Sequence, residues 1–160
     1  MDGARNDSDA VTLLREVQGA VQEFNIAVIA ALYADFHRAG TLNPAHLPHI
    51  AATAGVHGCL MDTAIKDGHG LFDFLDPGAL RLLAQQAHAS GLSFGLAGAL
   101  NEQDLLTSHD LGADVVGVRT AACRNHQRNG PLEAARVKRL HDRIKKYGHT
   151  NLRISDTCLP

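Results

Sequence analysis

The stretch that decides the fold runs from Cys59 to Phe74 and reads CLMDTAIKDGHGLFDF. Its apolar first part predicts a buried strand over Cys59–Ile65, and the KDG at 66–68 predicts the turn that ends it. Because side chains alternate along a strand, we expect Asp62 and Lys66 to share one face at its carboxyl end. That edge is where α/β enzymes place catalytic groups, although the same pair could form a simple surface salt bridge.

The rest of the chain predicts helices that alternate with short strands. Helices are expected over 9–24 (capped by Ser8 or Asp9), 44–54, 77–90, 101–112 and 132–147, and further strands over 25–34, 93–100 and 114–118. Such alternation predicts an α/β fold with parallel strands joined by right-handed crossovers. Either a small doubly wound sheet or part of a (βα)₈ barrel fits, and a whole barrel needs about 250 residues. We expect a disordered start over 1–8, one domain over 9–147 and a loose tail over 148–160.

Composition narrows the class of protein. The chain has 160 residues, 45% of them hydrophobic and 20% charged, with a net charge of −2, so neither nucleic acid nor a membrane is an expected partner. The three cysteines are odd in number and far apart, which favours a cytoplasmic protein over a disulfide framework. Despite ten histidines there is no HxH or HExxH motif, so we expect no metal. The sequence also contains no glycine-rich nucleotide-binding fingerprint.

Three places carry candidate chemistry. Lys66, desolvated at a strand end, could form a Schiff base or transfer protons, and Asp62 could orient its amine; a solvated cap is the alternative. Gly98 lies in a turn before a helix that Asn101 would open, which suits an anion, although the glycine could serve only close packing. Arg119 at the end of the last strand is placed to clamp a phosphate.

Four blocks of sequence resemble the (5-formylfuran-3-yl)methyl phosphate synthase family. They read YADFHRAGTLNP at 33–44, LMDTAIKDGHGLFDF at 60–74, GLAGAL at 95–100 and GADVVGVRTAAC at 112–123, with RNG at 128–130. The resemblance implies a TIM (β/α)₈ barrel that condenses two molecules of glyceraldehyde 3-phosphate, with loss of phosphate and water, in methanofuran biosynthesis. It implies a lysine Schiff base and no cofactor. It places the acid and lysine of the DTAIK motif at Asp62 and Lys66, and the phosphate-binding end at Gly98 and Arg119.

The resemblance also implies that family members are longer. Their first four strands, which carry the Schiff-base lysine, have no counterpart in this sequence. We therefore expect a parallel (βα) half-barrel, the last four strands of a TIM barrel, that needs a second copy or a separately encoded N-terminal half. A phosphate-binding half-barrel without turnover, or class I aldolase-like activity through Lys66, are the alternatives that the residues leave open.

Overall fold

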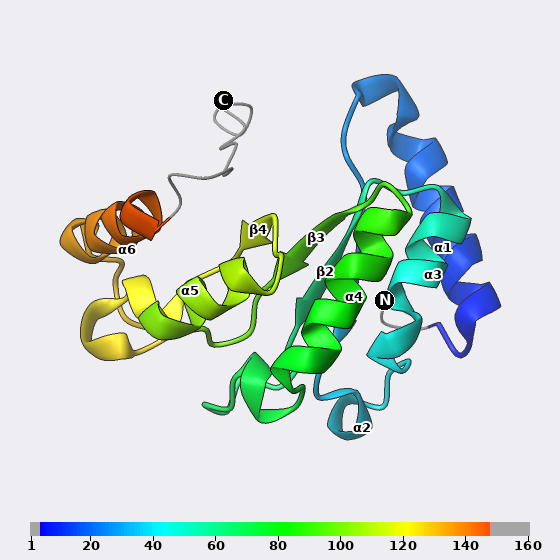
Figure 1. Ribbon diagram of the computed structural model, residues 1–160. Coiled ribbons are helices and arrows are strands. Elements are labelled where there is room, and N and C mark those ends of the chain that lie inside the picture. The colour runs from blue at the N-terminus through cyan, green and yellow to red at the C-terminus, as the bar shows by residue number, and fades with distance from the viewer. Residues whose placement is uncertain (1–3, 148–160) are drawn as a thin grey trace.

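The computed structural model describes residues 4–147, which form an α/β fold around one four-stranded sheet (Figure 1). The strands are β1 (Ile29–Tyr33), β2 (Gly58–Asp62), β3 (Ser93–Leu96) and β4 (Val115–Val116). The helices are α1 (Asp7–Val21), α2 (Phe36–Ala39), α3 (Leu47–Ala54), α4 (Pro77–Ala89), α5 (Glu102–Asp110) and α6 (Ala134–Tyr147). All three strand pairs are parallel and the order is β1-β2-β3-β4, so the predicted α/β fold with a parallel sheet is confirmed. Within residues 4–147 no helix is long and apolar enough to cross a bilayer.

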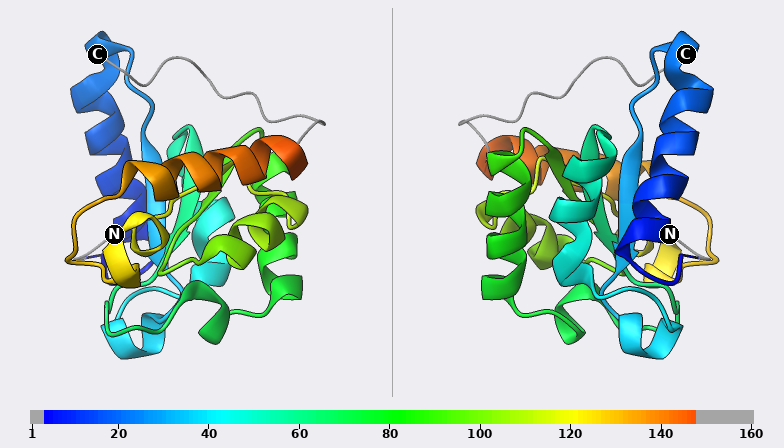
Figure 2. Two further views of the ribbon diagram at one scale, coloured as in Figure 1. Left: turned by 90° about the vertical axis from the view of Figure 1, so that its left-hand side faces the viewer. Right: turned by 90° about the vertical axis from the view of Figure 1, so that its right-hand side faces the viewer.

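One face of the sheet is sealed by helices. Figure 2 shows α3 and α4 in front of the strands in its right-hand view, with α1 beside them on the β1 side. The side chains on this face are 0–1% exposed and form paired rows across neighbouring strands: Ala30, Leu32, Cys59, Met61, Phe94 and Leu96. On the other face, Ile29 is 45% and Val115 62% exposed. The helices therefore bury one face of the sheet much more completely than the other.

Helix ends follow the capping residues that the sequence supplies. Asp76 caps α4 through a 3.0 Å bond from Ala79 N, with Pro77 in the first turn, and Asn101 caps α5 as predicted. Both caps fix where a helix begins after a loop on the carboxyl side of a strand. They therefore set the lengths of the two loops that border the candidate site.

The first helix begins earlier than predicted. The side chain of Asn6, rather than Ser8 or Asp9, caps it by accepting a 2.9 Å bond from Asp9 N. Asp7 and Ser8 are therefore helical, which corrects the predicted disordered start at those two positions. Residues 1–3 and the predicted tail over 148–160 lie outside the described residues.

Every predicted strand is shorter in the structure. The strand predicted over 25–34 begins only at Ile29, because Asn25 adopts a left-handed conformation (φ 51°) after a 3₁₀ turn at Gln22–Phe24. Segment 35–43, where no helix or strand was predicted, contains α2, and segment 120–131 contains 3₁₀ turns at Thr120–Ala122 and Arg124–His126. The extra length of the apolar runs lies in turns, which carry the candidate site.

Candidate functional site

The candidate site lies where the parallel strands end. Because all four strands run the same way, the residues that follow them meet at one edge of the sheet. Asp35 follows β1, Asp62 ends β2, Gly98 follows β3 and Arg119 follows β4. Backbone bonds tie adjacent ends together: Ala34 N donates to the Asp62 carbonyl at 2.8 Å.

Lys66 and Asp62 are in contact, but not for the reason that the sequence suggested. The ammonium of Lys66 donates to Asp62 Oδ1 at 2.8 Å, and it lies 3.3 Å from Thr63 Oγ1. We expected a strand through Ile65 to align the pair, yet β2 ends at Asp62. The pair forms because the chain turns after Asp62 and returns the lysine four residues later. Both side chains are partly shielded, at 27% and 28% exposure.

Gly98 lies directly against this pair. Its φ of +111° is open to glycine, and a Cβ built there would lie 3.3 Å from Asp62 Oδ1 and 3.0 Å from Thr63 Cγ2. Its carbonyl accepts a 2.9 Å bond from Leu71 N, so the loop after β2 folds back over the turn after β3. Close packing therefore explains this glycine, and its role toward phosphate stays a prediction.

Asp35 is a further acid at this edge of the sheet, between the end of β1 and the start of α2. At this position a carboxylate can either cap the helix or reach the neighbouring loop. Its side chain does not cap α2, which it precedes, and its carboxylate instead accepts bonds from Ala64 N (2.7 Å) and Ile65 N (2.9 Å). Burial acts to raise the pKa of Asp35, but these backbone donors, together with Arg38, hold it below its ordinary value. Only the fold could reveal this contact, because it joins segments about thirty residues apart.

A second link joins the same two loops at the surface. Arg38 in α2 pairs with Asp67, and its guanidinium lies 5.3 Å from the centre of the Phe74 ring. His69 Nδ1 lies 3.0 Å from Asp67 Oδ1. The hydrogen bond from Arg38, with a smaller contribution from His69, lowers the pKa of Asp67. The loop after β2 is therefore fastened to the loop after β1 on both sides of Lys66.

Arg119 is not brought to the pair. It is exposed, its carbonyl accepts a 3.0 Å bond from Ala122 N, and among residues 4–147 no hydrogen bond or ion pair links its side chain to Asp62, Lys66 or Gly98. Arg124, in the loop after β4, is ion-paired with Glu133 at 2.8 Å. Phosphate binding by Arg119 stays a prediction.

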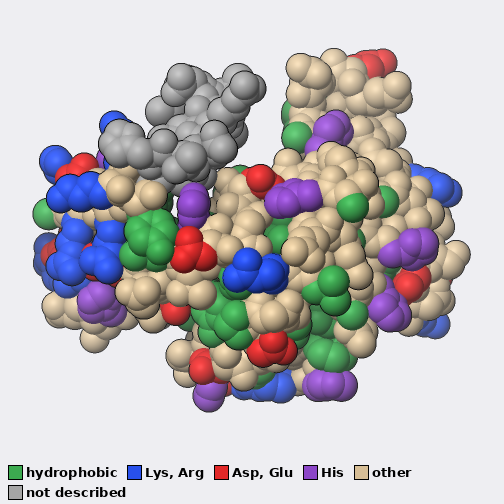
Figure 3. Space-filling model, in the orientation of Figure 1, with side chains coloured by type: hydrophobic (Ala, Val, Ile, Leu, Met, Phe, Trp, Pro, Cys, Tyr) green, Lys and Arg blue, Asp and Glu red, His purple; other side chains and the backbone are tan. Residues whose placement is uncertain are grey.

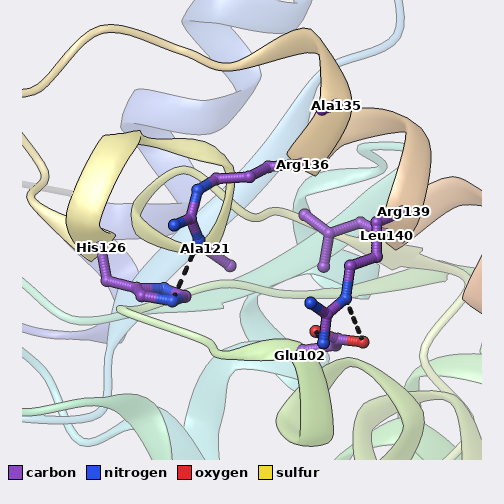
Figure 4. Close-up of a pocket in the computed structure, with 7 residues that line it drawn as sticks. All are labelled: Glu102, Ala121, His126, Ala135, Arg136, Arg139 and Leu140. Atoms are coloured by element: carbon purple, nitrogen blue, oxygen red, sulfur yellow. Dashed lines mark hydrogen bonds and ion pairs between the residues drawn. The ribbon is translucent and has the colours of Figure 1, made fainter.

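A separate pocket of about 290 Å³ lies between α5, the loop after β4 and α6 (Figure 4). Arg136 Nη1 lies 3.0 Å from His126 Nε2 there, and Arg139 pairs with Glu102 at 2.8 Å. Figure 3 shows Lys and Arg side chains gathered over α6. Arg136 also pairs with Glu133, so the arginines that line this pocket are matched by acids. It shares no residue with the Asp62–Lys66 site and is not a substitute for it.

Metal ligands do not gather in the part of the chain that the structure describes. No group of three or more His, Cys, Asp or Glu there could hold an ion. What the geometry does supply is an acid and an amine in contact, beside a tight glycine turn, at the carboxyl edge of a parallel sheet. This defines an α/β protein with a candidate acid–amine site.

Comparison with known proteins identifies the family. A family model described as 4-HFC-P synthase matches residues 1–141, so the chain belongs to the 4-HFC-P synthase family. Over 145 residues, 89% of this chain, it is 41% identical to the (5-formylfuran-3-yl)methyl phosphate synthase of Methanopyrus kandleri. Proteins of the same name from Methanothermobacter thermautotrophicus and Methanocaldococcus jannaschii are 39% identical over 91% of the chain and 40% over 89%. The chain spans only 61–62% of the length of these three relatives.

Proposed function

We propose that this chain is part of a lyase-type synthase that condenses two molecules of glyceraldehyde 3-phosphate to 4-(hydroxymethyl)-2-furancarboxaldehyde phosphate in methanofuran biosynthesis. Its family membership supports this proposal, as does the name shared by its relatives. The observation that carries it is the 2.8 Å contact between Lys66 and Asp62 at the carboxyl edge of the sheet. An amine that a carboxylate orients can move protons to and from a carbonyl compound.

In this proposal Lys66 transfers protons and Asp62 fixes the direction of its amine. The condensation needs a carbanion next to a carbonyl, and a Schiff base stabilises that carbanion by drawing electrons into the iminium. A lysine from outside this chain forms the Schiff base, and no cofactor takes part. Gly98 and Arg119 bind phosphate, because the turn after β3 and the cation after β4 end at the same edge of the sheet.

We propose further that the sheet is half of a TIM barrel, its last four strands. Support comes from the sequential order of four parallel strands and from helices that seal one face while Ile29 and Val115 stay exposed on the other. On α1, Leu13 and Val17 are 39% and 41% exposed and lie one turn apart, as in a helix that packs against a further helix.

We propose that polypeptide equivalent to the rest of its relatives' length covers these surfaces, encoded separately or supplied by a second copy. The assembly contacts neither nucleic acid nor a membrane. We place it in the reducing cytoplasm because Cys59 and Cys123 are free thiols.

The test uses the protein purified from its native cells, so that any partner remains bound. Furan phosphate formed from glyceraldehyde 3-phosphate is measured by liquid chromatography and mass spectrometry. We expect Lys66→Met to abolish product and Lys138→Met, on exposed α6, to leave it unchanged. Product formed by Lys66→Met at the wild-type rate would overturn the assigned role of Lys66.

Borohydride trapping separates the two alternative functions from the proposed one. In the described residues Lys66 is the only lysine before α6, so an adduct at Lys66 itself would favour aldolase-like chemistry. An adduct on a co-purified polypeptide supports the synthase with a Schiff-base lysine from elsewhere. Neither adduct nor product, with phosphate still bound, would favour a phosphate-binding half-barrel.

A further inference from the structure

Asp35 is a buried acid that the proposed chemistry does not use. Its residue is 2% exposed, and in the described part of the chain it is the only Asp, Glu, Lys or Arg in the buried class. A carboxylate this deeply buried costs free energy unless donors surround it. Its place between the end of β1 and the start of α2 brings it to the edge of the sheet that carries Lys66.

Both oxygens of Asp35 are committed to the backbone of one turn. Oδ1 accepts from Ala64 N at 2.7 Å and Oδ2 accepts from Ile65 N at 2.9 Å. A carboxylate that accepts two backbone N–H bonds is held ionised and fixed in direction. Because Asp35 is also 2% exposed, its carboxylate is shielded from direct contact with a substrate.

The turn that Asp35 holds is the one that places Lys66. After Asp62 the amides of the chain no longer join the sheet: Thr63 N donates to Asp62 Oδ1 at 2.7 Å, and the next two amides donate to Asp35. The chain then reverses so that Lys66 Nζ returns to within 2.8 Å of Asp62 Oδ1. The lysine side chain has many rotamers, so its contact with Asp62 depends on a backbone fixed at Ala64 and Ile65.

We propose that Asp35 is a positioning residue that fixes the turn over 63–66 and so holds the amine of Lys66 against Asp62. The purpose of that placement rests on the proposed function. The placement itself is measured without turnover, so the two proposals fail separately. A purely structural role for Asp35 would stabilise the fold without a selective effect on Lys66.

Asp35→Asn is the direct test, because it keeps the shape of the side chain and removes the charge. An amide offers one oxygen and one NH₂, so one of the two backbone N–H groups would face a donor. We expect the turn to loosen and Lys66 to leave Asp62 part of the time. Lys66 should then react with trace acetic anhydride roughly three times faster or more, since an amine that is no longer held against Asp62 is more accessible to the reagent.

Peptide mass spectrometry reads this rate for each lysine of the full chain. Lys138, Lys145 and Lys146 of α6 serve as internal references. The matched control is Asp114→Asn: Asp114 also accepts a backbone bond, from Phe94 N at 2.7 Å, but lies at the opposite edge of the sheet, before β4. In Asp114→Asn, the ratio of Lys66 labelling to labelling of the α6 lysines should equal the ratio in the unmutated chain. An unchanged ratio in Asp35→Asn, or an equal rise in both variants, would overturn the proposal.

Hydrogen exchange on the unmutated chain keeps the proposal testable if Asp35→Asn does not fold. The amides of Ala64 and Ile65 lie beyond β2 and should still exchange at least roughly tenfold more slowly than that of Gly68 in the same loop, because they donate to a buried acid. Exchange as fast as at Gly68 would overturn it. Where furan phosphate is formed, Asp35→Asn should lower kcat with little change in KM.

Discussion

Gly98→Ala tests whether the turn after β3 and the Asp62–Lys66 pair form one packed unit. The added methyl group would lie 3.0 Å from Thr63 Cγ2, 3.2 Å from Thr63 N and 3.3 Å from Asp62 Oδ1. All three atoms belong to Asp62 and Thr63, the two residues that Lys66 contacts, and Thr63 N is a backbone atom. The methyl group would therefore push on the start of the turn over 63–66 rather than on a side-chain tip that can swing away.

Gly68→Ala is the matched control. Gly68 has a φ of +103°, close to the +111° of Gly98, and nothing lies within 4 Å of the position that its Cβ would take. Both variants cost about 1–3 kcal/mol for a non-glycine residue in this backbone region. Only Gly98→Ala adds overpacking, worth about 1–3 kcal/mol in a tightly packed site. We expect Gly98→Ala to be less stable than Gly68→Ala by about that second amount.

Urea unfolding followed by circular dichroism measures both free energies. The slope of the unfolding free energy against urea should be the same for the two variants, so that a shifted midpoint reports stability alone. Gly98→Ala should also raise the labelling of Lys66, and Gly68→Ala much less. Equal stability losses would refute the reasoning: the Gly98 turn would then be loosely packed on Thr63, and its glycine would need another explanation such as the approach of a phosphate.

Three further predictions test other parts of the structure. The pKa of Asp67 lies below its ordinary 3.8, so the stability contributed by the Arg38–Asp67 pair is present above that pH and is lost as pH falls through the folded-state pKa. Arg38→Met should therefore lower the free energy of unfolding in urea at pH 7, and this loss of stability should shrink below about pH 4. Burial raises the pKa of the Cys59 thiol to about 12, so its peptide should remain unlabelled by a maleimide at pH 7 until the chain is unfolded, and rapid native labelling would contradict this. Leu80→Ala, at a fully buried position of α4, should cost about 2–5 kcal/mol, whereas Leu82→Ala, 54% exposed on the same helix, should cost less than about 0.5 kcal/mol.

The longer helices were predictable because their signals are local, whereas the single-turn α2 was not predicted. Asp76 with Pro77, and Asn101 with its oxygen directed at the next turn, begin α4 and α5 where the sequence places them. The strand ends were not predictable in the same way. An apolar run such as 25–34 shows that a segment is buried, but the pairing of neighbouring strands decides where the ladder begins and ends.

The end of β2 shows the physical reason. We expected the strand to continue to Ile65, and the apolar pattern allows it. Side-chain oxygens take the backbone donors instead: Asp62 binds the amide of Thr63, and Asp35 binds those of Ala64 and Ile65. Such competition ends a ladder without any change in hydrophobicity. Asp62 could have signalled the first of these bonds from sequence, but the other two depend on a residue about thirty positions away.

The contacts at the end of β2 also show which part of the site this chain holds in place, the Asp62–Lys66 pair, and which part it does not, the side chain of Arg119. The placed lysine is supported by β1, β2, β3 and the turns after them, because Asp35, Asp62 and Gly98 converge on the four consecutive residues 63–66. Arg119 has no such support, since its side chain is exposed and the structure links it to none of these residues. A cation that nothing orients binds phosphate weakly, because the ligand must immobilise the side chain as it binds. The acid–amine pair is thus preorganised within the described residues, whereas the proposed phosphate binding would require either substrate or further polypeptide to order Arg119.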